Sequence, residues 1–256
     1  MKKFVIIISL ISVLAGLASG QKTPAKPWTQ WTNKDVKMML DESGWGLVQT
    51  DTDTSQLLFR QSNSTTHTGS SETDIRSPAS VSYHIRFLSA RPIRQALARQ
   101  IMLAKELQSP PDQLKTLAEM SSGDFITIAV YCDSSDPRAV GPSMQAFGSA
   151  NLGVLKNAAY LERKDGKRLF IDAYQPPNSQ GYGALFRFQR MADGKPFITA
   201  DTGTVRFHAE VPYAAGTPPS AATRSSVVPG SSNSNMVQLE MKFKVSEMMF
   251  DGKLEY

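Results

Sequence analysis

Residues 80–107 constrain the fold more than any other stretch, because a strand pattern runs directly into a helix pattern there. Over residues 81–87, apolar and polar side chains alternate with the period of a half-buried strand. From Ile93 onward, apolar side chains recur every three or four positions, as on one face of a helix. Ser89 is placed to cap this helix, and Pro92 falls in its first turn, where a missing N–H costs little. We therefore predict a sheet with this helix packed against it.

The second half of the chain repeats the tripeptide Asp-Gly-Lys, which begins at Asp165, Asp193 and Asp251. Asp-Gly favours the positive φ angles of a tight hairpin turn. We predict three hairpins, which pair residues 159–164 with 168–174, 184–191 with 196–200, and 245–250 with 253–256. Further strands are predicted at 124–132, 204–211 and 236–245, and further helices at 32–42, where Thr32 and Asp35 form a capping-box pattern, and at 112–120. The predicted class is α+β, a mainly antiparallel sheet with two or three helices packed on one face.

The first twenty residues have the pattern of a secretory signal peptide. Lys2 and Lys3 precede an apolar run of fourteen residues, which is short for a membrane span of about 20 residues. Small residues before the boundary place cleavage between Gly20 and Gln21. The alternative is an uncleaved N-terminal anchor. We expect an exported protein, periplasmic or extracellular, with no transmembrane segment after signal removal.

Residues 21–256 are expected to form a single α+β domain with Ser-rich loops near 61–79 and 213–235. Removal of Lys2 and Lys3 lowers the formal charge from +5 to +3, which is too mild to indicate nucleic acid as a partner. Cys132 is the sole cysteine, so an internal disulfide is excluded, as is a lipid anchor on a cysteine after the cleavage site.

The three tryptophans, Trp28, Trp31 and Trp45, bracket the predicted N-terminal helix. They could form an aromatic platform for a sugar or a peptide. Alternatively they clamp the helix onto the body of the protein, and the large area that a tryptophan buries favours this second interpretation.

Arg86, Arg91 and Arg94 gather where the central strand meets its helix and are candidates for binding an anionic surface. The alternative is a solvated helix face whose arginines pair with nearby acids. Cys132 is a candidate nucleophile, but the acidic residues that follow it would disfavour the thiolate, so a small core residue is the preferred interpretation.

The sequence contains no motif of a known catalytic, cofactor or metal site. The histidines lack a second ligand at metal-binding spacing, and neither G-x-S-x-G nor a glycine-rich phosphate loop occurs. We therefore predict no metal and no cofactor. A glycosidase carboxylate pair cannot be recognised in a single sequence and stays open.

Three blocks, PWTQW, SVSYHIRFLSARPIRQA and the C-terminal DGKLEY, resemble a family of uncharacterised small exported bacterial proteins. The resemblance covers most of the chain outside the signal peptide and the Ser-rich loops. It implies export and a single fold, and it implies no catalytic residue.

These observations favour a non-enzymatic exported protein that acts by binding at the cell envelope, with another envelope protein or a glycan as the partner. Two alternatives remain open. One is an exported hydrolase whose site is assembled from scattered residues, and the other is a component of a larger envelope assembly.

Overall fold

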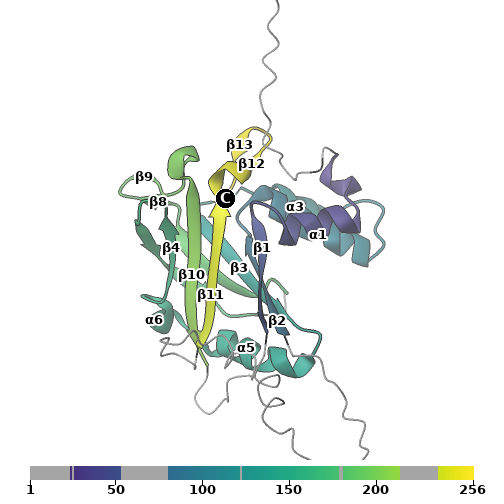
Figure 1. Cartoon of the computed structure of the whole chain (residues 1–256). Coiled ribbons are helices and arrows are strands. Elements are labelled where there is room, and N and C mark those ends of the chain that lie inside the picture. Colours follow the sequence, from purple (N-terminus) through teal and green to yellow (C-terminus); the bar gives the residue numbers. More distant parts are fainter. Residues whose placement is uncertain (1–23, 25, 53–79, 122, 179–180, 214–235) are drawn as a thin grey trace, which may run out of the picture.

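The computed structural model describes residues 24, 26–52, 80–121, 123–178, 181–213 and 236–256. The predicted signal peptide, the Gly20–Gln21 cleavage site and nearly all of both Ser-rich loops lie outside the described residues. The architecture is α+β with mainly antiparallel sheets, as predicted from the sequence (Figure 1).

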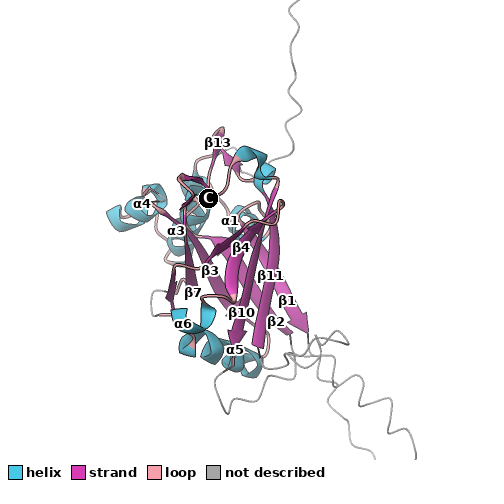
Figure 2. Ribbon diagram, turned by 90° about the vertical axis from the view of Figure 1, so that its left-hand side faces the viewer, coloured by secondary structure: helices cyan, strands magenta, loops and turns pink. Residues whose placement is uncertain are grey.

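Two antiparallel sheets form the body of the protein (Figure 2). One sheet has five strands in the order β1-β2-β3-β7-β6, and the other has four in the order β11-β10-β4-β5. The first sheet comprises β1 (Gly46–Thr52), β2 (Ser80–Phe87), β3 (Phe125–Asp133), β7 (Ala184–Gln189) and β6 (Ala173–Gln175). The second comprises β11 (Met236–Lys244), β10 (Thr204–Pro212), β4 (Ala159–Arg163) and β5 (Arg168–Phe170).

Aromatic side chains from both sheets meet in the core between them. Phe87 on β2 contacts Phe243 on β11 edge to face, with ring centroids 4.8 Å apart. Phe207 on β10 contacts Phe186 and Phe188 on β7 in the same manner. Edge-to-face packing is a preferred geometry for such rings, and these contacts hold the inner faces of the two sheets together. The alternating burial of β2 and β10 follows directly, because every second residue points into this core.

Helices lie at both ends of the sheets (Figure 1). Beside the five-stranded sheet, α3 (Arg91–Ala104) packs against both α1 (Asn33–Asp41) and α4 (Asp112–Glu119). Near the other end are α5 (Pro137–Ser149) and α6 (Leu152–Leu155). No helix within the described ranges is long and apolar enough to cross a bilayer.

The central strand and helix form as predicted, except at the helix cap. Pro92 lies in the first turn of α3, but the N-cap is Ala90, and its side chain makes no capping hydrogen bond. The prediction that Ser89 caps the helix is wrong, because its Oγ accepts a hydrogen bond from the backbone N–H of Thr127, 3.0 Å away. Ser89 thus joins the start of α3 to β3. The predicted capping box between Thr32 and Asp35 at the start of α1 is confirmed.

Each Asp-Gly-Lys tripeptide forms a hairpin turn, but the flanking strands are shorter than predicted. The predicted pairing of residues 184–191 with 196–200 is wrong over most of its length, because residues 184–189 form β7, which pairs with β3 and β6. Besides β4–β5, the hairpins are β8 (Met191–Ala192) with β9 (Lys195–Pro196) and β12 (Met249–Phe250) with β13 (Lys253–Leu254). Residues 168–174 are not one strand, because the chain passes from one sheet to the other. The backbone N–H of Ile171 bonds to Ala159 of the four-stranded sheet, and that of Asp172 bonds to Arg187 of the five-stranded sheet.

Gly46 allows β1 to pass close to the end of α1. A Cβ at this position would lie 2.1 Å from the carbonyl oxygen of Leu40, a distance that side-chain carbons do not adopt. The same carbonyl oxygen accepts a hydrogen bond from Arg86 Nε at 3.1 Å. A larger residue at position 46 would therefore displace the end of α1 from β2.

We expect Gly46→Ala to lower the free energy of unfolding by about 1–3 kcal/mol, as overpacking does elsewhere. The control is Gly148→Ala in α5, where an added Cβ meets no atom within 4 Å. Alanine is the better helix former, so this variant should be at least as stable as the wild type. Urea denaturation of both variants measures the difference, and equal stabilities would contradict the prediction.

Candidate functional site

A hollow of about 650 Å³ lies between α1, α3 and the outer face of the five-stranded sheet. Its wall combines aliphatic side chains with polar and charged ones from all three elements. The lining residues are Asn33, Val36, Lys37, Leu40 and Asp41 from α1, Leu97 and Gln100 from α3, His84 and Arg86 from β2, Tyr131 and Asp133 from β3, and Gly181. Pockets for small ligands characteristically combine an apolar wall with a few convergent polar groups.

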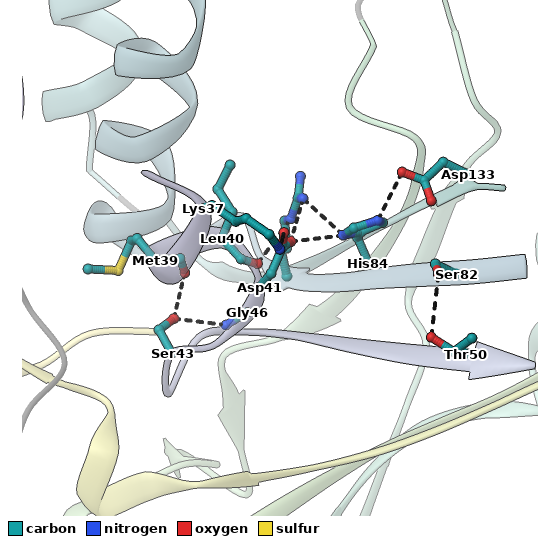
Figure 3. A network of polar contacts seen from close by, with 11 residues as sticks. Lys37, Met39, Leu40, Asp41, Ser43, Gly46, Thr50, Ser82, His84 and Asp133 are labelled. Carbon is teal, nitrogen blue, oxygen red and sulfur yellow. Dashed lines mark hydrogen bonds and ion pairs between the residues drawn. The ribbon is translucent and has the colours of Figure 1, made fainter. Parts of the chain in front are cut away.

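Asp41 is the last residue of α1, and the turn that follows fixes its position. The Ser43 hydroxyl donates to the carbonyl oxygen of Met39 at 2.6 Å and accepts from the backbone N–H of Gly46 at 3.2 Å (Figure 3). Trp45 anchors the same turn, because its indole N–H donates to the carbonyl oxygen of Glu255. The Asp41 carboxylate is thereby held over β2 with its side chain only 10% exposed.

His84 lies between two carboxylates (Figure 3). Its Nδ1 is 2.8 Å from Asp41 Oδ1, and its Nε2 is 3.3 Å from Asp133 Oδ2. The ionised Asp41 accepts the Nδ1 hydrogen, which fixes the orientation of the ring. Asp133 is more than half exposed and lines the hollow, so the Nε2 side of the ring is the side that faces the hollow.

Arg86 completes the cluster from the same face of β2. Its Nη2 donates to Asp41 Oδ1 at 2.8 Å. Burial alone would raise the pKa of Asp41, but hydrogen bonds from His84 and Arg86 outweigh it and hold that pKa well below its usual range. Asp41 is therefore a permanent anion that positions the two neighbouring side chains.

The hollow continues along the sheet toward Leu88, Ala129 and Tyr182. Tyr131 lies where the two parts meet, and its side chain is 42% exposed. Its ring centroid is 6.0 Å from that of His84. A polar cluster and an accessible aromatic ring therefore share one wall.

The three candidate arginines are not brought together. Arg86 lines the hollow, whereas Arg91 pairs with Asp251 at 2.9 Å and lies over the ring of Phe250. Arg94 is 4% exposed, and its guanidinium donates to three backbone carbonyl oxygens. Burial lowers the pKa of Arg94 from its ordinary value. Arg91 and Arg94 thus serve the packing around α3, and they do not extend the site.

The tryptophans and the cysteine also lie away from the hollow. Trp31 and Trp45 are each 1% exposed, and Trp28 packs partly buried against the core. Cys132 points into the core, where burial, followed by the charge of Asp133, raises the pKa of the thiol to about 12. The thiol is therefore protonated at neutral pH and is not a ready nucleophile.

Sequence reasoning did not identify Asp41, His84 and Asp133 as a group. None of the three residues belongs to a recognisable motif. Positions 41, 84 and 133 are far apart in the chain, and no spacing rule connects them. A partial indication was available at His84 and Arg86, which occupy outward positions of a strand followed directly by a covering helix. Polar residues under a helix need buried partners, but the sequence does not say which ones.

We expect Asp41→Asn to lower the free energy of unfolding at neutral pH by about 1–3 kcal/mol, because a part-buried charged hydrogen-bond acceptor is lost. The folded-state pKa of Asp41 is depressed. Its stabilising effect is therefore complete above the unfolded pKa of about 3.9 and disappears as the pH falls below it. Urea denaturation should show the two proteins converging below about pH 4.

The control is Asp112→Asn in α4, whose carboxylate is 99% exposed and pairs loosely with Lys115. This variant should match the wild type at neutral pH. A difference between the wild type and Asp41→Asn that stays constant down to strongly acidic pH would contradict the assigned role of Asp41.

Comparisons with known proteins do not assign the site. No protein-family model matches the chain, and searches of curated proteins and of solved structures find no significant match.

Proposed function

We propose that this is an exported protein that binds a neutral, polar ligand of the saccharide class in the hollow beside α1, without converting it. The observation that carries the proposal is the wall of the hollow, where hydrogen-bonding groups held by Asp41 lie next to an accessible aromatic ring. The predicted signal peptide supports a place at the cell envelope, where glycans are abundant ligands.

The charges of the hollow favour a neutral ligand. Lys37 and Arg86 supply two positive charges, and Asp41 and Asp133 supply two negative ones. Lys37 and Arg86 are both paired with Asp41, at 3.3 and 2.8 Å. These four formal charges sum to zero, so the hollow offers neither an anion nor a cation a net charge of opposite sign. A polyhydroxyl ligand would instead meet both donors and acceptors, including Asn33 and Gln100 at the rim.

Tyr131 supplies the second element of the proposal. An exposed aromatic ring offers an apolar face, and its hydroxyl adds a polar edge. A sugar ring has the complementary character, with C–H groups on one face and hydroxyls around its edge. The adjoining aliphatic side chains of Val36, Leu40 and Leu97 extend the apolar part of the wall.

The test uses the full exported chain on an array of immobilised neutral oligosaccharides, followed by calorimetric titration of the best-bound sugar. We expect Tyr131→Ala to weaken binding about three- to tenfold, because ring contacts are lost. Tyr131→Phe keeps the ring and should retain most of the affinity.

The matched control is Phe170→Ala on β5, which removes a ring of similar exposure, 45%, from the other sheet. Its affinity should equal that of the wild type. The proposal fails if no member of the array is bound, or if Tyr131→Ala and Phe170→Ala behave alike.

One observation favours hydrolysis as a second candidate. Asp41 orients His84 through Nδ1, as an acidic residue orients a histidine that acts as a general base. Within the described part of the chain, no serine, threonine or cysteine is hydrogen-bonded to His84. The base would therefore have to activate water, with Asp133 turned away from Nε2.

The two candidates are distinguished by incubating the array oligosaccharides and chromogenic esters with the wild type and with His84→Gln. We expect the wild type to release no product. Product release that depends on His84 would replace the binding proposal with the hydrolytic one.

A further inference from the structure

A second hollow, of about 420 Å³, lies at the opposite side of the molecule from α1 and α3. Its lining residues come from the end of β4, the turn that follows it, and the β8–β9 hairpin, and Figure 1 shows this hairpin on the side away from α1 and α3. Basic residues dominate its wall. The lining residues are Arg163, Lys167, Arg168, Ala192, Asp193, Lys195, Pro196 and Phe197.

Two of the three Asp-Gly-Lys turns face each other across this hollow. In the first turn, Gly166 has a φ of 82° and donates its N–H to the carbonyl oxygen of Arg163, which reverses the chain within three residues. In the second turn, Asp193 and Gly194 both have positive φ, the geometry that a two-residue hairpin requires. Each turn therefore delivers its lysine, Lys167 or Lys195, to the rim of the same hollow.

Arg163 forms the floor beside the buried ring of Phe197. Its Nη2 pairs with Asp165 at 2.9 Å, and its Nη1 donates to the carbonyl oxygen of Phe197 at 3.2 Å. Its Nε is buried without a hydrogen-bond acceptor. Asp165 is fully engaged, since its other oxygen accepts from the backbone N–H of Lys167. The donors of Arg163 are therefore incompletely satisfied by the protein.

Arg168 pairs with Glu162 at 2.6 Å, but Arg206 shares that carboxylate. The guanidinium of Arg168 also lies over the ring of Tyr160, 4.5 Å from its centroid. These contacts fix the guanidinium and leave Glu162 facing two cations. Among the described residues, neither Lys167 nor Lys195 is paired with a carboxylate. Four cations thus line the hollow together with the carboxylate of Asp193. Within the described part of the chain, the two arginines are paired with carboxylates, and the two lysines are not.

We propose that this hollow binds an oxyanion of the phosphate class. At neutral pH a phosphate group carries one negative charge as a diester and close to two as a monoester, and it has several acceptor oxygens. Two anchored guanidinium groups and two unpaired ammonium groups complement it in charge and in number of donors. A single carboxylate would satisfy fewer of these donors. The phosphate belongs either to a small soluble molecule or to the headgroup of an anionic lipid.

The first experiment titrates the full exported chain with inorganic phosphate at constant ionic strength and follows backbone amide shifts by NMR. We expect the double variant Lys167→Ala/Lys195→Ala to bind phosphate about tenfold more weakly than the wild type. The control is Lys253→Ala, which removes the lysine of the third Asp-Gly-Lys turn and should change the affinity less than about twofold. All of these lysines are exposed, so the fold should be preserved.

The second experiment measures co-sedimentation with vesicles of phosphatidylglycerol and with vesicles of phosphatidylcholine alone. Binding to the anionic vesicles that the double variant loses would assign the phosphate to a lipid headgroup. Phosphate titration without vesicle binding would assign it to a soluble molecule. The inference is overturned if chloride shifts the same amides as phosphate, if the double variant and Lys253→Ala behave alike, or if neither probe binds.

This inference stands independently of the saccharide proposal, because the two hollows share no lining residue. Tyr131→Ala should leave phosphate binding unchanged, and the double lysine variant should leave oligosaccharide binding unchanged. A variant that loses only oligosaccharide binding or only phosphate binding therefore identifies the hollow in which that ligand binds.

Discussion

The ionised carboxylate of Asp41 joins the helical layer to the five-stranded sheet. The outward residues of β2 lie under α1 and α3, and two of them, His84 and Arg86, carry polar side chains that are only 12% and 14% exposed. Such groups are costly to bury unless they find partners. Asp41 provides one acceptor for both, and the Leu40 carbonyl provides another for Arg86. The end of α1 is thus fixed by polar contacts, and the side chains that make these contacts also line the hollow.

The Gln49 side chain connects β1 to β11, the facing edge strands of the two sheets. Gln49 on β1 donates from Nε2 to the carbonyl oxygen of Gln238 at 2.8 Å, and its Oε1 accepts from the backbone N–H of Glu240 at 3.0 Å. The amide therefore makes the two hydrogen bonds that a neighbouring strand would make to β11. Edge strands with unpaired backbone groups tend to pair with strands of other molecules. Gln49 satisfies two of these backbone groups on the edge strand β11. The same strand begins at Gly46, so β1 is positioned at one end by its contact with α1 and in its middle by β11.

Local patterns in the sequence predicted the elements, and contacts between distant segments account for what they missed. Alternation predicted β2 and β10, and the tripeptide at Asp193 predicted a turn, because these depend on neighbouring residues alone. The passage of the chain between sheets at Ile171 was missed, because each half of that segment is strand-like and only the pairing partners differ. The candidate site was missed for the same reason. Arg86 was selected for its charge, but its partner Asp41 could not be identified without the fold.

The two hollows differ in charge because their cations lie on different kinds of element, a covered strand in one and exposed turns in the other. In the hollow beside α1, Arg86 lies near the end of a covered strand, where burial makes a carboxylate partner necessary, so the charges cancel. In the hollow between the Asp-Gly-Lys turns, Lys167 and Lys195 are on exposed turns, where water solvates an unpaired ammonium at little cost. The buried Arg86 is therefore ion-paired within the protein, whereas the exposed lysines on the turns remain available to pair with an anionic ligand. This difference in solvation is the physical reason for assigning a neutral ligand to one hollow and an anion to the other.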